Sequence, residues 1–129
     1  MARLSNILLL DDCETIRTIL KVYLMGQVET FRETADAETA LQLLELEAFD
    51  LVIADVRMEP IDGVAFVRQV RSSASARVRG TPVVLLTSDL SLQLRAEGLG
   101  AGANAFVHKP ITAKELRDTL DMVAARATG

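Results

Sequence analysis

Apolar residues gather into four short, uninterrupted runs along the chain. The runs are ILLL at 7–10, LVIA at 51–54, PVVLL at 82–86 and AFV at 105–107. Such runs are typical of strands that are covered on both faces, as in a parallel sheet packed between helices. A fifth segment, VETF at 28–31, alternates between apolar and polar residues. We therefore expect a parallel sheet of five strands with this segment at an edge.

Between these runs, apolar residues recur at the spacing of amphipathic helices. Four clear helices are predicted, which begin after Asp12, after Asp36, after the pair Asp62-Gly63 and after Thr112. Asp12 and Asp36 are candidate N-caps, because a short carboxylate side chain accepts hydrogen bonds from the free N–H groups of the first turn. Thr112 and Glu115 have the spacing of a capping box.

The segment 91–102 is a weaker helix candidate. Gly98 and Gly100 each cost about 1 kcal/mol relative to alanine in a helix interior, so we expect a short or labile helix here. The stretch 72–80, SSASARVRG, is predicted to be a loop. Strands that alternate with helices predict a doubly wound α/β fold with five helices on the two faces of the sheet, in a single domain over residues 1–129.

Composition limits the function. The chain has 129 residues, of which 50% are hydrophobic, which suffices for one core. The net charge is −4 and the basic residues are scattered, so we expect no direct contact with nucleic acid. The lone cysteine, Cys13, excludes an internal disulfide and follows two acids that disfavour a thiolate. The apolar run near the N-terminus is too short for a signal peptide or a membrane span, so we expect a cytoplasmic protein without membrane contact.

Polar side chains follow each central strand of the predicted sheet. They are Asp11 and Asp12 after the first run, Asp55 after the second, Thr87 and Ser88 after the third, and Lys109 after the fourth. Taken singly, each has an ordinary interpretation as a helix cap, a loop acid, a turn residue or a solvated charge. Because ligands of such sheets bind beyond the carboxyl ends of the strands, the set as a whole predicts a functional site.

The chemistry of this site follows from its charges. Three carboxylates that converge at strand ends repel one another, and a hard divalent cation with oxygen ligands removes that cost. Mg²⁺ keeps open positions for phosphate oxygens, and the Thr87 hydroxyl and the Lys109 ammonium suit the remaining oxygens of a phosphoryl group. Asp55, at the end of a central strand, is the candidate nucleophile that would form an aspartyl phosphate.

Four segments, LLLDD, LVIADVRMEPIDG, PVVLLTS and GANAFVHKP, resemble in order and spacing the receiver domain of response regulators in two-component signalling. The resemblance runs from about Ile7 to the last predicted helix. It implies a flavodoxin-like strand order 2-1-3-4-5 and a Mg²⁺-dependent switch that promotes its own phosphorylation and dephosphorylation. The implied partners are a sensor histidine kinase or a histidine phosphotransfer protein, which donates the phosphoryl group, and a downstream protein target.

The same resemblance implies roles for individual residues. It assigns Mg²⁺ binding to Asp11, Asp12, Asp55 and the backbone carbonyl of Arg57, phosphorylation to Asp55, switching to Thr87 and Phe106, and catalysis to Asp55, Thr87 and Lys109. Without the resemblance, Phe106 would be interpreted as core. In the family, the peptide bond that matches Lys109-Pro110 is cis, and a bond before proline is of a type for which cis is accessible.

The resemblance also points to residues that would affect the lifetime of the phosphoryl group and to residues that would contact the protein that donates it. The positions of Arg57 and Asp89 tune the lifetime of the phosphoryl group in the family, and their opposite charges here suggest a pair across the mouth of the site. The candidate donor contacts on the first predicted helix are Glu14, Arg17, Thr18 and Lys21. Glu59 departs from the family, which has Pro after the Met, and would add a negative charge near the metal. His108 is expected to be an ordinary side chain at a strand end.

Two other functions fit parts of the pattern. A phosphohydrolase of the haloacid-dehalogenase type also uses an aspartate nucleophile and Mg²⁺, but it would need a second acid two residues beyond Asp55, where this chain has Arg57. A receiver-like scaffold that acts without phosphorylation would be expected to lack the acids or Lys109. All of these groups are present in the sequence, which favours the phospho-accepting receiver.

Overall fold

The computed structural model describes residues 4–89 and 91–128. The strands over this part of the chain are β1 (Leu4–Leu10), β2 (Val28–Thr34), β3 (Leu51–Asp55), β4 (Val83–Thr87) and β5 (Ala105–His108). The helices are α1 (Glu14–Tyr23), α2 (Ala37–Leu46), α3 (Gly63–Arg71), α4 (Ala76–Arg79), α5 (Leu92–Ala101) and α6 (Ala113–Thr128). Every predicted strand is present.

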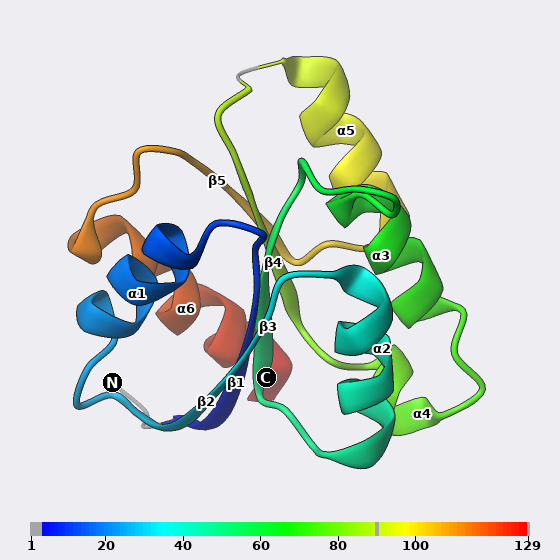
Figure 1. Cartoon of the computed structure of the whole chain (residues 1–129), viewed down its shortest axis with the longest axis horizontal. Coiled ribbons are helices and arrows are strands. Elements are labelled where there is room, and N and C mark those ends of the chain that lie inside the picture. The colour runs from blue at the N-terminus through cyan, green and yellow to red at the C-terminus, as the bar shows by residue number, and fades with distance from the viewer. Residues whose placement is uncertain (1–3, 90, 129) are drawn as a thin grey trace.

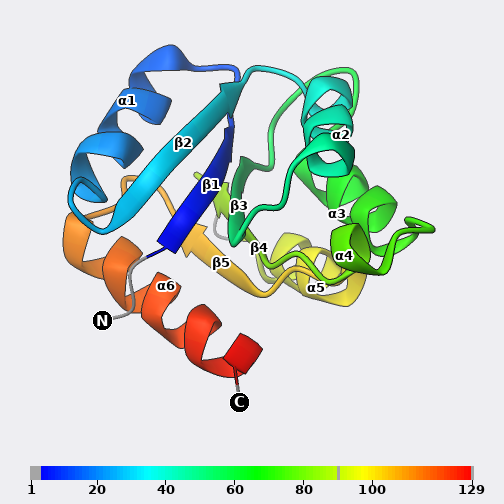
Figure 2. The ribbon, with the colours of Figure 1, turned by 90° about the horizontal axis from the view of Figure 1, so that it is seen from below.

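The strands form one parallel sheet in the order β2-β1-β3-β4-β5. Helices α1 and α6 lie on one face, and α2, α3, α4 and α5 lie on the other (Figures 1 and 2). The expected doubly wound fold, its strand order and the edge position of β2 are confirmed. Within the described ranges, no helix has the length and apolar character needed to cross a membrane.

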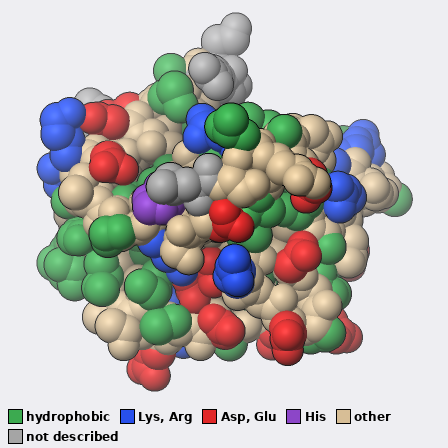
Figure 3. All heavy atoms as spheres, turned by 90° about the horizontal axis from the view of Figure 1, so that it is seen from above, with side chains coloured by type: hydrophobic (Ala, Val, Ile, Leu, Met, Phe, Trp, Pro, Cys, Tyr) green, Lys and Arg blue, Asp and Glu red, His purple; other side chains and the backbone are tan. Residues whose placement is uncertain are grey.

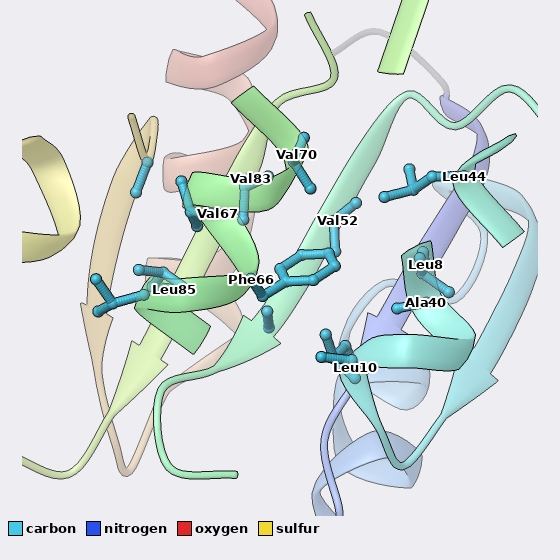
Figure 4. Packing of buried hydrophobic residues seen from close by; sticks show 14 of the residues in the cluster. Leu8, Leu10, Ala40, Leu44, Val52, Phe66, Val67, Val70, Val83 and Leu85 are labelled. Carbon is cyan, nitrogen blue, oxygen red and sulfur yellow. The ribbon is translucent and has the colours of Figure 1, made fainter. Parts of the chain in front are cut away.

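The sheet is buried on both faces because successive side chains of β1, β3 and β4 point in opposite directions. Toward α2 and α3, Val52 and Leu85 contact the α3 side chains Phe66 and Val67, with Leu8 farther along the same core (Figure 4). Toward α1 and α6, a second core contains the side chains of Ile7, Leu9, Ile53, Leu86 and Leu116. The uninterrupted apolar runs in the sequence are the consequence of this double coverage.

The structure corrects two predictions about helices. The stretch 72–80 contains the one-turn helix α4, so the described chain has six helices and not five. The N-cap of α1 is Cys13 and not Asp12, and among the described residues its side chain makes no capping hydrogen bond. The helix expected at 91–102 is present as α5, which ends at Ala101 and is followed by its C-cap Gly102 in the left-handed conformation.

The other predicted helix starts agree with the structure. The side chain of Asp36 accepts a hydrogen bond from the N–H of Thr39, at 2.8 Å, and so caps α2. The N–H of Glu115 donates to the hydroxyl of Thr112 at 3.1 Å, which is the threonine half of the predicted capping box. These caps stabilise the first turns of α2 and α6.

Candidate functional site

The carboxyl ends of β1, β3, β4 and β5 bring the predicted residues to one edge of the sheet. Asp55 is the last residue of β3, which lies between β1 and β4, and it is paired in register with Leu86. Asp11 follows the last residue of β1, Thr87 is the last residue of β4 and Lys109 follows the last residue of β5. The strand order therefore places Asp55 between the acids of β1 and the hydroxyl of β4.

Three carboxylates meet at this edge. Oxygen atoms of Asp11, Asp12 and Asp55 all lie within 4.8 Å of one another. The residues differ in exposure, since Asp11 is 1% and Asp55 7% exposed, whereas Asp12 is open to solvent. In the space-filling view from above, acidic side chains gather around the middle of the face with basic side chains among them (Figure 3). The predicted convergence of the acids is present.

Lys109 supplies positive charge to the buried acids. Its Nζ lies 3.2 Å from Oδ1 of Asp55 and 3.4 Å from Oδ2 of Asp11. Partial burial of the ammonium lowers the pKa of Lys109, but the attraction of the two carboxylates outweighs it, so the pKa is raised above its ordinary value. Lys109 therefore remains protonated at neutral pH and bridges two strand ends.

Asp11 is held in place through both its side chain and its backbone. Burial raises the pKa of its carboxyl group, and the N–H of Cys13, which donates to Oδ1 at 2.9 Å, offsets this only in part. The guanidinium of Arg17 donates to the backbone carbonyl of Asp11 and also pairs with Glu33 on β2 at 3.1 Å. The sequence pattern does not reveal this role of Arg17 and predicts an exposed donor contact instead, whereas the side chain is only 15% exposed.

The remaining candidate donor contacts on α1 are partly available. Glu14 and Thr18 are exposed, whereas Nζ of Lys21 pairs with Glu33 at 2.6 Å and its side chain is 35% exposed. The two basic residues of α1 thus attach the helix to β2 through one carboxylate. Only Glu14 and Thr18 of the predicted set fully face solvent.

The loop after β4 makes a hydrogen bond to the side chain of Thr87. The Thr87 hydroxyl oxygen, in a residue that is 2% exposed, accepts a hydrogen bond from the N–H of Asp89 at 3.0 Å. The Asp89 carboxylate in turn accepts from the N–H of Ser91 at 2.8 Å, next to the start of α5. Nε2 of His108 lies 3.2 Å from the carbonyl oxygen of Ser88, which joins β5 to the same loop. Among the described residues, the Thr87 hydroxyl is seen only as an acceptor, so its proton can be donated to a further group.

Arg57 and Asp89 form an ion pair at the mouth of the site. The guanidinium nitrogen of Arg57 lies 3.6 Å from a carboxylate oxygen of Asp89, and the Arg57 side chain is 72% exposed. Both residues line a cleft of about 590 Å³, which is also lined by Asp12, Val56, Met58, Glu59, Asp62 and Leu94. The expected pairing across the opening is therefore present, and the unusual Glu59 does face the cleft.

Close backbone packing shapes the loop between β3 and α3. A Cβ atom at Gly63 would lie 2.5 Å from the carbonyl oxygen of Asp55 and 2.8 Å from Cα of Val56, so only glycine fits. The N–H of Gly63 donates to the carbonyl of Val56 at 2.9 Å. The Glu59-Pro60 and Lys109-Pro110 bonds are both cis.

Phe106 lies next to this site on the face covered by α5. It is partly buried and packs against the core cluster that contains Leu85, with which it is paired across β4 and β5. This position is compatible both with a packing role in the core and with a role as a switch.

The donor set suits Mg²⁺. Carboxylate oxygens are the ligands that this hard cation prefers, and one exposed acid beside two buried ones leaves room for the waters that Mg²⁺ retains. Asp11, Asp12 and Asp55 are thus able to hold a divalent cation beside the cleft that Asp12 lines.

Comparison with known proteins decides the family. The profile of the response regulator receiver domain matches residues 7–121. The chain belongs to this family. This receiver domain is 34% identical over 126 residues to the chemotaxis protein CheY of Pseudomonas aeruginosa, covering 96% of this chain and 99% of that protein.

Solved structures agree with this assignment. The chemotaxis response regulator CheY4 of Vibrio cholerae superposes with a TM-score of 0.84 at 30% identity, covering 93% of this receiver domain and 98% of that chain. The receiver domain of the sensor histidine kinase PA1611 of Pseudomonas aeruginosa has a TM-score of 0.82 at 26% identity, covering 96% and 99% of the two chains. That structure has a magnesium ion coordinated in its active-site cleft.

Family membership establishes the general function. The receiver domain is homologous to CheY-type response regulators and is a signalling switch of two-component systems, in which receivers interact with sensor histidine kinases. Receivers bind Mg²⁺ in their acidic pocket, and the acidic cluster of this chain has the matching composition.

The buried charge of Asp11 predicts a pH dependence of stability. Because burial raises the pKa of Asp11 above 3.8, the folded protein binds this proton at a higher pH than the unfolded chain does. The free energy of unfolding therefore carries no penalty from Asp11 below pH 3.8, where the carboxyl group is protonated in both states. It falls as the pH rises through the pKa of Asp11 in the folded protein. In the presence of a chelator, we expect Asp11→Asn to be more stable than the wild type at pH 7, with a difference that shrinks on acidification toward pH 4.

Urea unfolding at several pH values measures this difference. Asp118→Asn, which removes the same charge from an exposed position on α6, is the control for net charge. An advantage of Asp11→Asn that grows on acidification would contradict the effect assigned to burial.

Proposed function

We propose that this receiver domain accepts a phosphoryl group on Asp55 from a phosphohistidine protein and thereby changes a surface that a target protein binds. The observation that carries the proposal is the position of Asp55, a nearly buried carboxylate within the acidic cluster with the Lys109 ammonium 3.2 Å away. Such a carboxylate is a candidate nucleophile and has a cation beside it to offset the added negative charge.

The proposed transfer of the phosphoryl group is a single displacement at phosphorus. A carboxylate oxygen of Asp55 attacks phosphorus, the new P–O bond forms as the P–N bond of phosphohistidine breaks, and the imidazole leaves with the bond electrons. Lys109 is close enough to move from the Asp55 carboxylate to a phosphoryl oxygen. The proton of the Thr87 hydroxyl can be donated to another phosphoryl oxygen, since that hydroxyl acts only as an acceptor toward Asp89.

The metal would be held by Asp11, Asp12 and Asp55, with the backbone carbonyl of Arg57 as a further oxygen ligand. When bound there, Mg²⁺ would supply positive charge that offsets the negative charge of a phosphoryl group beside the acids. The donor set and its partial exposure support this assignment. Removal of the phosphoryl group by water at the same site would make the domain a switch that promotes its own phosphorylation and dephosphorylation.

The competing functions have less support. A haloacid-dehalogenase-type hydrolase needs an acid where Arg57 stands, and Arg57 pairs with Asp89 at the cleft mouth. A scaffold that acts without phosphorylation would not need the acidic cluster or Lys109, and both are in place.

The output of the switch would involve Thr87 and Phe106. Movement of the Thr87 hydroxyl toward a phosphoryl group on Asp55 frees space on the face of the sheet that Phe106 shares, so the ring can turn and alter the surface of α5, β5 and α6. The proposed partners are a histidine kinase or phosphotransfer protein as donor and a downstream protein as target, all in the cytoplasm. Neither nucleic acid nor membrane contact is part of this proposal.

Phosphorylation by a small phosphodonor tests the proposal. With acetyl phosphate and Mg²⁺, we expect a mass increase of one phosphoryl group per chain, because a small donor needs no docking surface. Asp55→Asn should abolish the increase, and Asp118→Asn, with its change on the exposed face of α6, should retain it. Unchanged labelling of Asp55→Asn would show that another residue is the acceptor.

The ion pair at the cleft mouth predicts an effect on the lifetime of the phosphoryl group. We propose that Arg57 and Asp89 restrict the attacking water. Arg57→Ala and Asp89→Asn should each speed dephosphorylation by up to about fivefold, since an exposed ion pair contributes about 0–1 kcal/mol. Asp89→Asn retains an oxygen for the N–H of Ser91 and so spares the loop.

The double variant decides whether the two residues act together. Its effect on the rate of phosphate loss should be less than the product of the single effects, because both changes open one gate. Lys114→Ala, which breaks an exposed ion pair with Asp118, is the control and should leave the rate unchanged. Fully multiplicative effects, or no change from either single variant, would refute the gate.

A further inference from the structure

The ring of Phe106 occupies space that a side chain at Gly98 would fill. Gly98 lies on α5 and is buried against the sheet. A Cβ atom there would overlap Cε2 of Phe106 and would lie 3.1 Å from Cδ2 of that ring and 3.1 Å from Cδ1 of Leu85. We call this space, bounded by Gly98, Phe106 and Leu85, the Gly98 slot. Helix α5 lies this close to β4 and β5 because residue 98 has no side chain.

The second glycine of α5 has no such role. A Cβ atom at Gly100 would meet nothing within 4 Å, and the residue is exposed. The chain thus has two glycines that weaken the same helix, of which only Gly98 is required by packing. The pair provides a variant and its control in one element.

The C-terminal end of α5 is attached to the fold independently of the slot. The guanidinium of Arg71, at the end of α3, donates to the carbonyl of Gly102 at 3.0 Å and to Oδ1 of Asn104 at 2.8 Å. The same Asn104 oxygen accepts from the N–H of Val83 at the start of β4, at 2.8 Å. Helix α5 is therefore held at one end by Arg71 and rests near its middle on the ring of Phe106.

The ring is also linked to the candidate site through the sheet. Phe106 is paired with Leu85 across β4 and β5, and Thr87 lies two residues beyond Leu85 on the same strand and face. A ring that turns beside Thr87 changes how it fills the Gly98 slot, because the two places lie on one continuous face.

We propose that Gly98 is a positioning residue that couples the side-chain rotamer of Phe106 to the position of α5. In its regulatory part this rests on the proposed function, in which a phosphoryl group on Asp55 draws in Thr87 and the ring responds. The slot transmits that response, because α5 is attached near Gly102 through Arg71 and its buried middle contacts the ring at Gly98. A side chain at position 98 would remove the slot and with it the coupling.

Thermal unfolding of a set of variants tests the slot itself. In the wild-type background, Gly98→Ala should lower the midpoint, since its methyl group and the ring compete for one space. In the Phe106→Leu background, where the overlapping ring atom Cε2 is absent, the same change should lower the midpoint much less, because the gain in helix propensity is then opposed only by the tight contacts at 3.1 Å. Gly100→Ala should raise it in both backgrounds. A loss of midpoint from Gly98→Ala that is equally large in both backgrounds overturns the proposal, and Phe106→Ala serves as a second background.

Amide chemical shifts of α5 test the coupling. On phosphorylation, confirmed by intact mass, the amide shifts of residues 92–101 should change in the wild type and in Gly100→Ala and should change by less than half as much in Gly98→Ala. A full response in phosphorylated Gly98→Ala would overturn the coupling. Absence of phosphorylation would overturn the proposed function and the regulatory part together, whereas the thermal set decides separately whether the slot exists.

Discussion

Repulsion among three carboxylates is the constraint on which the site depends. Oxygen atoms of Asp11, Asp12 and Asp55 lie within 4.8 Å of one another, and Asp11 and Asp55 are nearly buried. Lys109 contributes one ammonium to the cluster, which leaves an excess of two negative charges. A divalent cation matches this excess, and a phosphoryl group then becomes acceptable beside a carboxylate. The cluster is therefore costly in isolation and suited to a charged ligand.

The rest of the fold holds these charges in place. Two apolar cores cover the sheet, so the strand ends that carry Asp55 and Thr87 are fixed by packing on both sides. Gly63 lets α3 begin against the backbone of Asp55, and Arg17 holds the carbonyl of Asp11. A stable scaffold of this kind tolerates a locally unfavourable cluster, which is a common arrangement at functional sites.

The sequence predicted what depends on local pattern and missed what depends on distant contacts. The strands and the acidic edge were predictable because a doubly covered sheet requires unbroken apolar runs and sends their carboxyl ends to one side. Helix α4 has four residues, too few for a period to be visible in SSASARVRG. Asp12 was expected to cap α1, but its carboxylate belongs to the acidic cluster, and Cys13 is the N-cap. The roles of Arg71 and Gly98 arise from contacts with Asn104 and Phe106, which no local pattern reveals.

Stabilisation by Mg²⁺ tests most directly the claim that the acidic cluster is a cation site held against its own repulsion. Urea unfolding should show that the wild type gains stability steadily as Mg²⁺ is added, since a ligand of the folded state stabilises it by mass action. Asp12→Asn, with one charge removed, should be at least as stable as the wild type in chelator and should gain little from Mg²⁺. A variant that is less stable than the wild type without metal, or that gains as much from Mg²⁺, would contradict the account.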